Sequence, residues 1–573
     1  MKKFIFALSF ALLMLSNFIY SQKYTAFKNV NIFIPTTGKV INNAVLIVKD
    51  SLIYSYGQLN KIKIPDNADT FNLKGKWIIP GLIDAHIHFF QSGGLYTRPD
   101  IIDLQKVIPY KQEMDNVKGN IDNVLLRYVK CGVTGIVDMG GPFWNFEVRE
   151  KCSINRTYPL TTVCGPLLSS YYPKNLDSID KPIIKVNNFE EIDYEINKQL
   201  QANTDFIKIW YIVRKGETPE THLPLIKHII DKSHNANKKV IVHATEHNTA
   251  LAAIEAGADI LAHSISDSLI SPKLLKLLKD RKVIYVPTLL VSQRYEEVFS
   301  RQLNLSSEEL LLGDYNIIKS LSDLWEIPDS LIPEKRKYWL PEQRPVKEQI
   351  IAMQNLKLLH DNGIHIATGT DAGNIGTLHG SSIFKEMQMM EKAGIPITDI
   401  IKYTTSNSGM LINQPNYGSF SKNTPASFII LNNNPLLDIK NIADINLVVN
   451  RGIIINPDSL LLSDNIGVIQ QQVNAYNARN IDVFMSYFAD DIVIKDLVTD
   501  KINATSNTEM RPMYIKLFNN TKTLHCKIVN RMTVGNYVMD REYVTGFPNN
   551  RTAEAVAIYL LKDGKIKTCS FLR

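Results

Sequence analysis

Polar side chains interrupt apolar segments of the chain at points where strands are expected to end. In GLIDAHIHF (81–89), Asp84, His86 and His88 alternate with apolar residues, so they share one face of a strand. Two histidines at positions i and i+2 near the carboxyl end of a strand can bind one metal ion from that face. Single strand histidines are more often structural, but this pair indicates a metal site.

Three further residues of the same chemistry close later apolar segments. His243 ends VIVH, His263 ends DILAH and Asp371 ends IHIATGTD. Imidazole nitrogen and carboxylate oxygen atoms are ligands of zinc and other divalent metals. Together with His86 and His88, these residues predict a metal centre assembled from several strands.

Lys208 lies in the apolar segment DFIKIWYIV (205–213), with Phe206 and Trp210 on its face. A lysine at this position points into a core of apolar side chains, where an unpaired ammonium group is costly. It therefore requires either a carboxylate partner or a reaction that removes its positive charge. The residues alone leave both possibilities open.

Eight apolar segments, separated by helical patterns, carry these residues. Near-continuous apolar strands that alternate with helices predict an α/β fold with a parallel sheet covered on both faces. Eight of them fit a closed (β/α)8 barrel of the TIM type, which keeps its reactive groups at the carboxyl ends of the strands. An open doubly wound sheet is disfavoured because no Gly-rich phosphate loop follows the early strands. The eight candidates are 81–89, 133–139, 159–165, 205–213, 239–245, 259–264, 282–291 and 364–371.

Shorter strand patterns flank the expected barrel, which we place at residues 80–413. Residues 22–79 and 414–462 contain short strands separated by turn residues, and predict one small composite β-sandwich domain built from both flanks. Within the barrel, an insert at 292–346 lies either at the catalytic mouth or on the surface as a solvated excursion. Residues 463–573 begin with a helical pattern and continue as antiparallel hairpins, which predicts a separate α+β domain.

The composition excludes several classes of protein. The 573 residues are 45% hydrophobic and 21% charged, which is ordinary for globular domains. The net charge of +7 is small and no basic stripe is present, so a nucleic-acid partner is not expected. Five scattered cysteines are too few for a disulfide framework or a cysteine-based zinc site.

The first residues have the pattern of an export signal. Two lysines precede an apolar run from Phe4 to Leu15, and Ser21 offers a small residue for cleavage. We therefore expect residues 1–21 to be a signal peptide, and the mature protein to be periplasmic or secreted with no membrane span. A permanent membrane anchor is the alternative, but the run is at the short end for spanning about 30 Å.

The motifs PGLIDAHIHF, DFIKIW, VIVHAT, AGADILAHS and TGTDAG, taken as a set, resemble the metal-dependent amidohydrolase superfamily. Its imidazolonepropionase-like and prolidase-like branch is the most similar, and the resemblance covers residues 24–456. The resemblance implies a site for two metal ions. His86, His88 and Asp371 would bind one ion, and Lys208 would bridge both ions as a carbamate formed with CO2.

By the same resemblance, His243 and His263 would hold the second ion. A metal-bridged hydroxide would be the nucleophile, since coordination lowers the pKa of bound water to about 7. Asp371 would accept its proton and pass it to the leaving nitrogen. Zinc is the first choice for both ions, with manganese or iron as alternatives.

Substrate contacts are less specified. The segment WYIVRKGETPE after Lys208 does not match the small-residue loop of prolidase-like members. Trp210, Tyr211 and Arg214 are candidates to line the substrate pocket, Arg214 for a substrate carboxylate, with packing at the rim as the alternative. His379 could also contact substrate, and Glu386 is expected to begin or support the next helix.

Residues 464–573 resemble the SnoaL-like, nuclear-transport-factor-2-like cone, a fold that encloses an apolar pocket. We expect this domain to bind a small ligand or to mediate oligomerisation, rather than to form a second active site. In the second case, the partner would be another copy of the chain in a homo-oligomer. Asp496, Asp540 and Glu542 lie on expected strands, where a position at an exposed edge is the plain interpretation.

The function that these patterns favour is an exported metal-dependent hydrolase of a carbon–nitrogen bond. Its substrate would be a small amide, cyclic amide or dipeptide-like molecule. Two alternatives remain: a mononuclear deaminase that uses only His86, His88, His243 and Asp371, and a non-catalytic protein that binds a small ligand. The state of Lys208 distinguishes the two enzymes, because only the binuclear site needs its carbamate.

Overall fold

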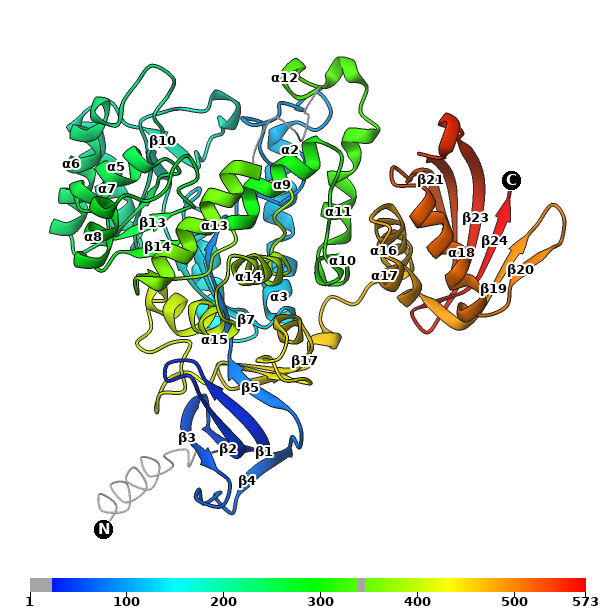
Figure 1. Ribbon diagram of the computed structural model, residues 1–573, viewed down its shortest axis with the longest axis horizontal. Coiled ribbons are helices and arrows are strands. Elements are labelled where there is room, and N and C mark those ends of the chain that lie inside the picture. The colour runs from blue at the N-terminus through cyan, green and yellow to red at the C-terminus, as the bar shows by residue number, and fades with distance from the viewer. Residues whose placement is uncertain (1–22, 338–345) are drawn as a thin grey trace, which may run out of the picture.

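The computed structural model describes residues 23–337 and 346–573. The expected signal peptide, residues 1–21, lies outside the described residues. A barrel occupies the centre of the molecule, with a small β domain at one end and a C-terminal domain at its side (Figure 1). In the described part of the chain, no helix has the length and apolarity required to cross a bilayer.

Parallel strands form the wall of the barrel. One sheet has the order β6-β7-β8, and a second sheet contains the run β11-β12-β13-β14-β15. Every residue of β6 and β7 is buried, because helices cover one side of these strands and the barrel interior lies on the other. The eight strands are β6 (Leu82–Ile87), β7 (Val133–Asp138), β8 (Leu160–Val163), β11 (Ile207–Trp210), β12 (Val240–His243), β13 (Ile260–Ala262), β14 (Ile284–Val286) and β15 (His365–Ile366).

Backbone contacts join the two sheets at both ends. A parallel bridge between Cys164 and Phe206 connects the end of β8 with the start of β11. On the other side, the N–H of Ala85 donates to the carbonyl of Thr368 at 2.9 Å, and the N–H of Asp371 donates to the carbonyl of His86 at 2.8 Å. Hydrogen bonding therefore runs around all eight strands, as the expected barrel requires.

Amphipathic helices cover the outside of the barrel. Helix α5 buries Ile192 and Ile196 and is capped by Asn188, whose side chain accepts from the N–H of Glu191 at 2.9 Å. The covering helices are α3 (Ile121–Lys130), α4 (Asn145–Ile154), α5 (Phe189–Gln201), α6 (Leu223–Asn235), α7 (His247–Ala256), α8 (Pro272–Asp280), α13 (Val346–Asp361), α14 (Ser382–Lys392) and α15 (Ile397–Lys402).

Two connections of the barrel contain elements that the sequence patterns did not indicate. Short strands β9 (Leu167–Ser169) and β10 (Ile183–Lys185) follow β8, and β9 pairs in parallel with the carboxyl end of β11. Helix α2 (Tyr110–Gly119) lies in the long connection after β6.

The insert after β14 is helical, with α9 (Leu289–Phe299), α10 (Ser307–Leu312), α11 (Tyr315–Leu321) and α12 (Glu334–Lys337).

Strands from both flanks of the barrel join in one β domain, which is built as a single sheet. Strand β16 pairs antiparallel with β5, which joins the two flanks in a single sheet of order β18-β17-β16-β5-β1-β2-β3, with β4 on β1. The long strand β1 pairs with β4 along its first half and with β5 near its end. The strands are β1 (Tyr24–Ile34), β2 (Lys39–Lys49), β3 (Leu52–Gln58), β4 (Ala68–Asn72), β5 (Trp77–Pro80), β16 (Phe428–Leu431), β17 (Ile445–Asn450) and β18 (Ile453–Ile455).

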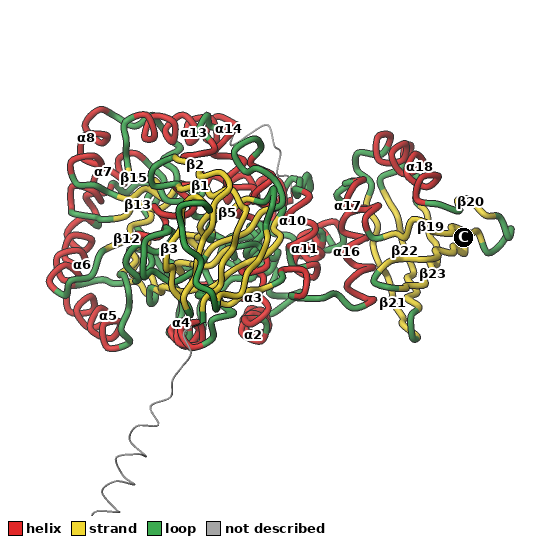
Figure 2. The backbone as a smooth tube through the Cα atoms, turned by 90° about the horizontal axis from the view of Figure 1, so that it is seen from below, coloured by secondary structure: helices red, strands yellow, loops and turns green. Residues whose placement is uncertain are grey.

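The C-terminal domain is the expected α+β unit, in which helices pack on one face of a curved sheet (Figures 1 and 2). The sheet has the order β20-β19-β24-β23-β22-β21. The elements are α16 (Asn465–Asn477), α17 (Ile481–Ser486), β19 (Phe488–Asp496), β20 (Ile502–Ala504), α18 (Asn507–Asn520), β21 (His525–Val534), β22 (Tyr537–Thr545), β23 (Ala553–Lys562) and β24 (Lys565–Leu572).

The structure corrects one expectation for this domain. Asp540 and Glu542 are buried, with 0% and 8% of their surface exposed, because their side chains point to the inner face of the sheet. Asp540 forms a two-pronged ion pair with Arg531, at 2.7 Å for both contacts. The position at an exposed edge that the sequence suggested is therefore wrong for these two residues.

The insert of the barrel carries the C-terminal domain. The ring of Trp325 stacks on His525 with the centroids 5.2 Å apart. The side-chain amide of Asn474 donates to the carbonyl of Tyr315 at 2.9 Å, and that of Asn480 donates to the hydroxyl of Ser307 at 3.0 Å. One apolar cluster runs across this junction, so the insert and the C-terminal domain share a core.

Candidate metal centre

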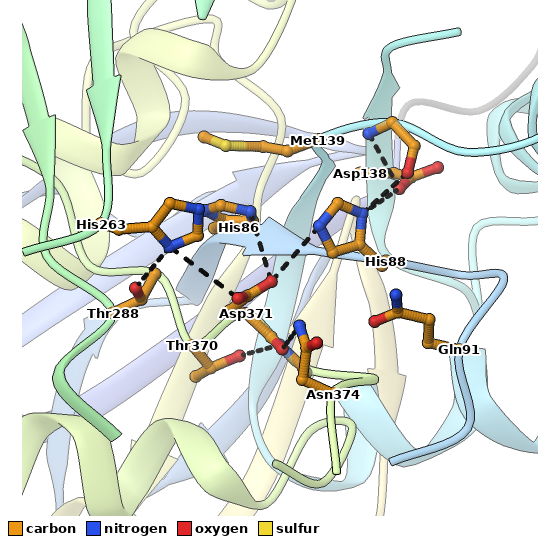
Figure 3. Close-up of polar contacts among 12 residues, drawn as sticks. His86, His88, Gln91, Asp138, Met139, His263, Thr288, Thr370, Asp371 and Asn374 are labelled. Atoms are coloured by element: carbon orange, nitrogen blue, oxygen red, sulfur yellow. Dashed lines mark hydrogen bonds and ion pairs between the residues drawn. The ribbon is translucent and has the colours of Figure 1, made fainter. Parts of the chain in front are cut away.

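Three histidines approach one carboxylate at the carboxyl ends of the barrel strands. His86 Nε2 and His88 Nε2 lie 3.4 and 3.3 Å from Asp371 Oδ1, and His263 Nδ1 lies 3.8 Å from Oδ2. The contacts converge on Asp371 from both sides (Figure 3). The segments that carry them are adjacent because β6 pairs with the chain that follows β15. The alternation of His86 and His88 on one strand face is thus what brings both rings to the same carboxylate.

Hydrogen bonds fix the ring of His88. Its Nδ1 lies 2.7 Å from the carbonyl oxygen of Gly140, which can only accept, so Nδ1 carries the proton and donates. Nε2 then carries a free lone pair, which lies on the side of Asp371. Asp138 Oδ1 lies 4.0 Å from the same Nδ1 and accepts from the N–H of Gly140 at 3.3 Å. A backbone acceptor behind an imidazole is the usual support of a metal-binding histidine.

His243 and His263 complete the ring of imidazoles. Their ring centroids are 4.3 Å apart, and that of His263 is 4.8 Å from His86. The hydroxyl of Thr288 lies 3.0 Å from His263 Nδ1. Thr288 itself has a φ of 43°, in the left-handed region that β-branched residues rarely adopt. This unusual backbone turns its hydroxyl toward His263.

Asp371 is held from behind by a second buried carboxyl group. Asp84 accepts from the N–H and the hydroxyl of Thr370, at 3.0 and 2.6 Å. Burial raises the pKa of Asp84 to about 7, against the effect of these hydrogen bonds. Asp371 has a φ of 60°, so the turn that presents its carboxylate requires such support.

A chain of side chains also reaches Asp371 from the loop after β6. Arg98 is held by Asp100 through two bonds of 2.8 and 2.6 Å, and donates to Asn374 Oδ1 at 2.5 Å. The hydroxyl of Tyr295 donates to the same oxygen at 2.6 Å. The amide of Asn374 then donates to the carbonyl of Asp371 at 3.1 Å (Figure 3). The loop and the insert thereby position Asp371 together.

The buried ligand groups are left without partners. Both ring nitrogens of His86 and Oδ1 of Asp371 make no hydrogen bond to any described residue. Burial lowers the pKa of His86 well below its usual value, and the pKa of His263 to about 3, so these imidazoles are neutral and have lone pairs to donate. Ligand atoms of His86, His263 and Asp371 lie within 4.8 Å of one another. Such a group fits a divalent metal ion.

Lys208 is buried beside this group, with 1% of its surface exposed. Its Nζ contacts Met139 Sδ at 3.8 Å and forms no ion pair with any carboxylate of the described chain. Burial lowers its pKa to about 8, although the charge of Asp371 acts in the opposite direction. The structure therefore does not supply the carboxylate partner that was one interpretation of this lysine.

A cavity of about 400 Å³ opens over the group, and Lys208, His243 and Asp371 form part of its floor. Trp210, Leu289 and Phe299 supply apolar walls. Residues of the insert line one side, so the insert lies at the mouth of the barrel rather than on a remote surface. This volume suits a small organic molecule.

Of the expected substrate contacts, Trp210 lines the cavity, but the other three, Tyr211, Arg214 and His379, lie elsewhere. The hydroxyl of Tyr211 donates to the carbonyl of Pro219 at 2.5 Å, and Arg214 is exposed and pairs with Glu217 at 2.6 Å. His379 is buried, with Tyr128 OH and the carbonyl of Gln91 each 2.8 Å from its ring nitrogens. The structure brings none of the three to the lining of the cavity. These residues lie on loops and a turn, where the spacing of residues in the sequence does not determine the direction of a side chain.

Glu386 has a larger part than its sequence suggested. It is buried on α14 and accepts from the N–H groups of Leu289 and Leu290 at 2.8 and 2.9 Å. These are the first residues of α9, so Glu386 caps a helix of the insert and fixes the adjoining Thr288. Burial raises the pKa of Glu386 to about 8. The sequence alone could not predict this contact, because Glu386 and Leu289 are 97 positions apart and no pattern links them.

A barrel with neutral imidazoles and a carboxylate at its strand ends has the arrangement of a metal-dependent hydrolase. The family model of the amidohydrolase family matches residues 77–456, and that of the SnoaL-like domain matches residues 469–568. The first match covers about two thirds of the chain. The chain therefore belongs to the amidohydrolase family, and it is a hydrolytic enzyme that acts on carbon–nitrogen bonds.

Solved structures show the same fold. A Xaa-Pro dipeptidase with methionine in its active site is 18% identical over 76% of this chain and 100% of its own, with a TM-score of 0.58. The ochratoxinase of A. niger is 18% identical over 76% and 96%, with a TM-score of 0.57. Molinate hydrolase is 16% identical over 78% and 97%, with a TM-score of 0.57. No curated protein matches the chain.

Proposed function

We propose that this amidohydrolase is exported and uses two divalent metal ions, zinc as first choice, to hydrolyse a small amide, cyclic amide or dipeptide-like substrate. One observation carries the proposal: His86, His88 and His263 converge on Asp371, and the buried ligand atoms of His86 and Asp371 are unpaired. Leaving such atoms unpaired costs about 1–3 kcal/mol each, and a cation would remove the cost.

His86, His88 and Asp371 would hold one ion, and His243 and His263 the other. When bound, the ions supply a hydroxide nucleophile at neutral pH and polarise the scissile carbonyl group. The neutral imidazoles support this assignment, since a protonated ring has no lone pair for a metal.

Lys208 would contribute as a carbamate. Its lowered pKa increases the fraction of free amine, and this amine adds to CO2 to give Lys–NH–COO⁻ and one released proton. The product exchanges a buried cation without a partner for an anion. The unfavourable burial of an unpaired ammonium group would then be removed by formation of the carbamate rather than by a partner residue.

Asp371 would accept the proton of the nucleophile and deliver it to the leaving nitrogen. Its position supports this part of the proposal, because the carboxylate lies both in the ligand group and at the floor of the cavity. Its Oδ1 forms no hydrogen bond with any described residue, which leaves this oxygen available to accept a proton.

The cavity supports a substrate with an apolar part. Trp210, Leu289 and Phe299 face it, while the charge of Arg98 is already matched by Asp100. Among the structural neighbours, one is a Xaa-Pro dipeptidase and one an ochratoxinase, which supports an amide or dipeptide-like bond. Export rests on the sequence pattern of residues 1–21.

The test is to purify the mature chain, load it with Zn²⁺ and assay a panel of amides, lactams and dipeptides. We expect hydrolysis of at least one class, two metal ions per chain by elemental analysis, and a carbamate signal by ¹³C NMR after exposure to ¹³CO2. An enzyme without activity across the panel under these conditions would contradict the proposal.

A mononuclear deaminase is the second candidate. This site would use His86, His88, His243 and Asp371, and two of these, His86 and Asp371, belong to a compact group of ligand atoms that does not include Lys208. One metal per chain, a free amine at Lys208 and release of ammonia from an amino-substituted ring would favour this function over the binuclear hydrolase.

A further inference from the structure

A second cavity, of about 570 Å³, is lined on one side by the loop that follows β6. Its walls also include parts of α2 and α3, helix α11 of the insert, and residues 461–463 before α16 (Figure 1). Among the described residues, only Gln91 lines both this cavity and the one over the metal centre. The volume is in the range of sites for small organic molecules.

A buried carboxyl group without a cationic partner lines this second cavity. Glu113, on α2, has only 7% of its surface exposed. Its Oε1 accepts from the hydroxyl of Ser92 at 2.6 Å, and the carboxyl group forms no ion pair with any described residue. Burial raises the pKa of Glu113, because the ionised form has lost water and gained no opposite charge. A buried carboxylate normally has a cation beside it, so this position lacks one.

Two ion pairs account for most of the other charged side chains of the lining. Arg127 pairs with Asp314 at 3.1 Å and donates to the carbonyl of Leu312 at 2.7 Å. Lys319 pairs with Asp323 at 3.2 Å. Both cations are therefore already matched by carboxylates of the insert, and neither is available to Glu113.

Lys130 is the remaining cation of the lining. It lies in the last turn of α3 and donates to the carbonyl of Leu460 at 2.9 Å. It forms no ion pair with Glu113 and so is not the partner that this carboxyl group lacks. The ligand that Glu113 favours is therefore a cation.

Apolar side chains surround the carboxyl group in the same cavity. Val117 lies one turn after Glu113 on α2, on the same face of the helix. Phe89 and Leu378 contribute from the barrel, and Ile317 from α11. These walls can cover a ring or a short hydrocarbon chain, while a charged end group reaches the carboxylate.

We propose that the second cavity is a binding site for a small organic cation, a primary amine attached to an apolar ring or short chain. The ammonium group pairs with Glu113, and the apolar part packs against Phe89, Val117, Ile317 and Leu378. Such a molecule contacts the barrel and the insert at the same time. The site is separate from the metal centre and does not rest on the proposed function of the barrel.

Calorimetric titration of the full-length mature chain tests the proposal. The probes are 2-phenylethylamine, 2-phenylethanol and 3-phenylpropanoate, which share a ring and differ in the charge of the end group. We expect saturable binding of one 2-phenylethylamine per chain, at least tenfold tighter than either of the other two, because hydrogen bonds between charged groups are the strong ones. No saturable binding of the amine at millimolar concentration would overturn the proposal. Equal affinity for all three probes, or tightest binding of the anion, would do the same.

Variants of α2 then locate the site. Glu113→Gln removes the charge and keeps an oxygen that can accept from Ser92. We expect it to weaken binding of 2-phenylethylamine at least tenfold and to leave the affinity for 2-phenylethanol unchanged. Asp115→Asn is the matched control, because Asp115 is an exposed carboxylate on the same helix and pairs with Lys111 outside the cavity. Binding of the amine that survives Glu113→Gln at full strength belongs to another site, and that result overturns the proposal.

A second variant keeps the test informative if Glu113→Gln disturbs the fold, which circular dichroism checks. Asn116 is exposed on α2 and lines the cavity, so Asn116→Trp fills part of it without a change in the core. We expect this variant to abolish binding of both the amine and the alcohol. Bound amine should also raise the melting temperature of the unchanged chain but not that of Asn116→Trp. Full affinity for the amine in Asn116→Trp would place its site elsewhere and overturn the proposal.

Discussion

The carboxylate of Glu386 accepts a hydrogen bond from the backbone N–H of Leu289 at 2.8 Å, and so caps helix α9 from the neighbouring helix α14. Thr288, the residue before this helix, contacts His263 at 3.0 Å. Glu386 therefore helps to place one imidazole of the candidate metal centre, although it is not itself one of the candidate ligands.

Glu386→Ala should damage both stability and metal binding. It leaves two buried N–H groups without an acceptor, which we expect to lower the free energy of unfolding by about 2–4 kcal/mol. Glu386→Gln keeps one acceptor oxygen and should recover part of the loss. Denaturant unfolding measures the first effect and elemental analysis of bound metal the second. Full metal content in a destabilised Glu386→Ala chain would show that the cap supports the fold alone.

Asp371→Asn should keep the fold and at least one metal ion while losing turnover. The amide cannot accept a proton, and removal of a general acid–base group costs about 10²–10⁴-fold in rate. The measurement is kcat on any substrate from the panel, with metal content determined in parallel. A rate close to that of the unchanged enzyme would exclude the proton transfer proposed for this residue.

Lys208→Met should separate metal binding from folding. Methionine fills the volume beside Met139 without a charge, and replacement of a buried charged group by an apolar one is often neutral or stabilising. We expect an unchanged or higher melting temperature of the metal-free chain, loss of the carbamate signal and fewer metal ions bound. Lys208→Glu, which restores an anion, is the companion variant and should recover metal. Two ions per chain in Lys208→Met would rule out a bridging carbamate.

Glu542 should make the C-terminal domain less stable at neutral pH than in mild acid. Burial raises its pKa from 4.5 to about 7, because the folded domain favours the neutral carboxyl group. The free energy of unfolding should therefore fall as the pH rises through this interval and then level off, by about 3 kcal/mol in all.

Glu542→Gln removes this dependence. The variant and the unchanged chain should have equal stability near pH 4, with the variant gaining an advantage toward pH 8, as followed by denaturant unfolding. Glu554→Gln changes an exposed glutamate of the same sheet and serves as the control. A constant difference between the Glu542 variant and the unchanged chain across this range would contradict a raised pKa.

The barrel could be predicted from the sequence, and so could the meeting of the histidines and Asp371 at its rim. Both follow from the order of the strands along the chain. His86 and His88 share a strand face by alternation, and His243, His263 and Asp371 lie where apolar segments end. Parallel strands in a closed barrel bring all such ends to one rim. The type and spacing of these residues were therefore sufficient to predict that their side chains lie close together, whereas their binding of a metal ion stays a prediction.

Contacts made by loops could not be predicted in the same way. Arg214 follows Lys208 closely in sequence, yet it turns to Glu217, because the chain leaves the barrel wall after Trp210. Arg98 and Tyr295 reach Asn374 from two separate connections, and neither segment has a period that encodes the meeting. Such contacts depend on the final path of the backbone.

The apolar cluster shared by the insert and the C-terminal domain has a consequence for shortened forms of the protein. A chain that ended before Asp464 would keep every residue of the metal centre. It would nevertheless lose the C-terminal part of the shared apolar cluster, so that helices α10 and α11 of the insert would no longer pack against α16. We expect such a barrel to aggregate. Low yield of folded protein, rather than the absence of site residues, would then limit efforts to study the two domains apart.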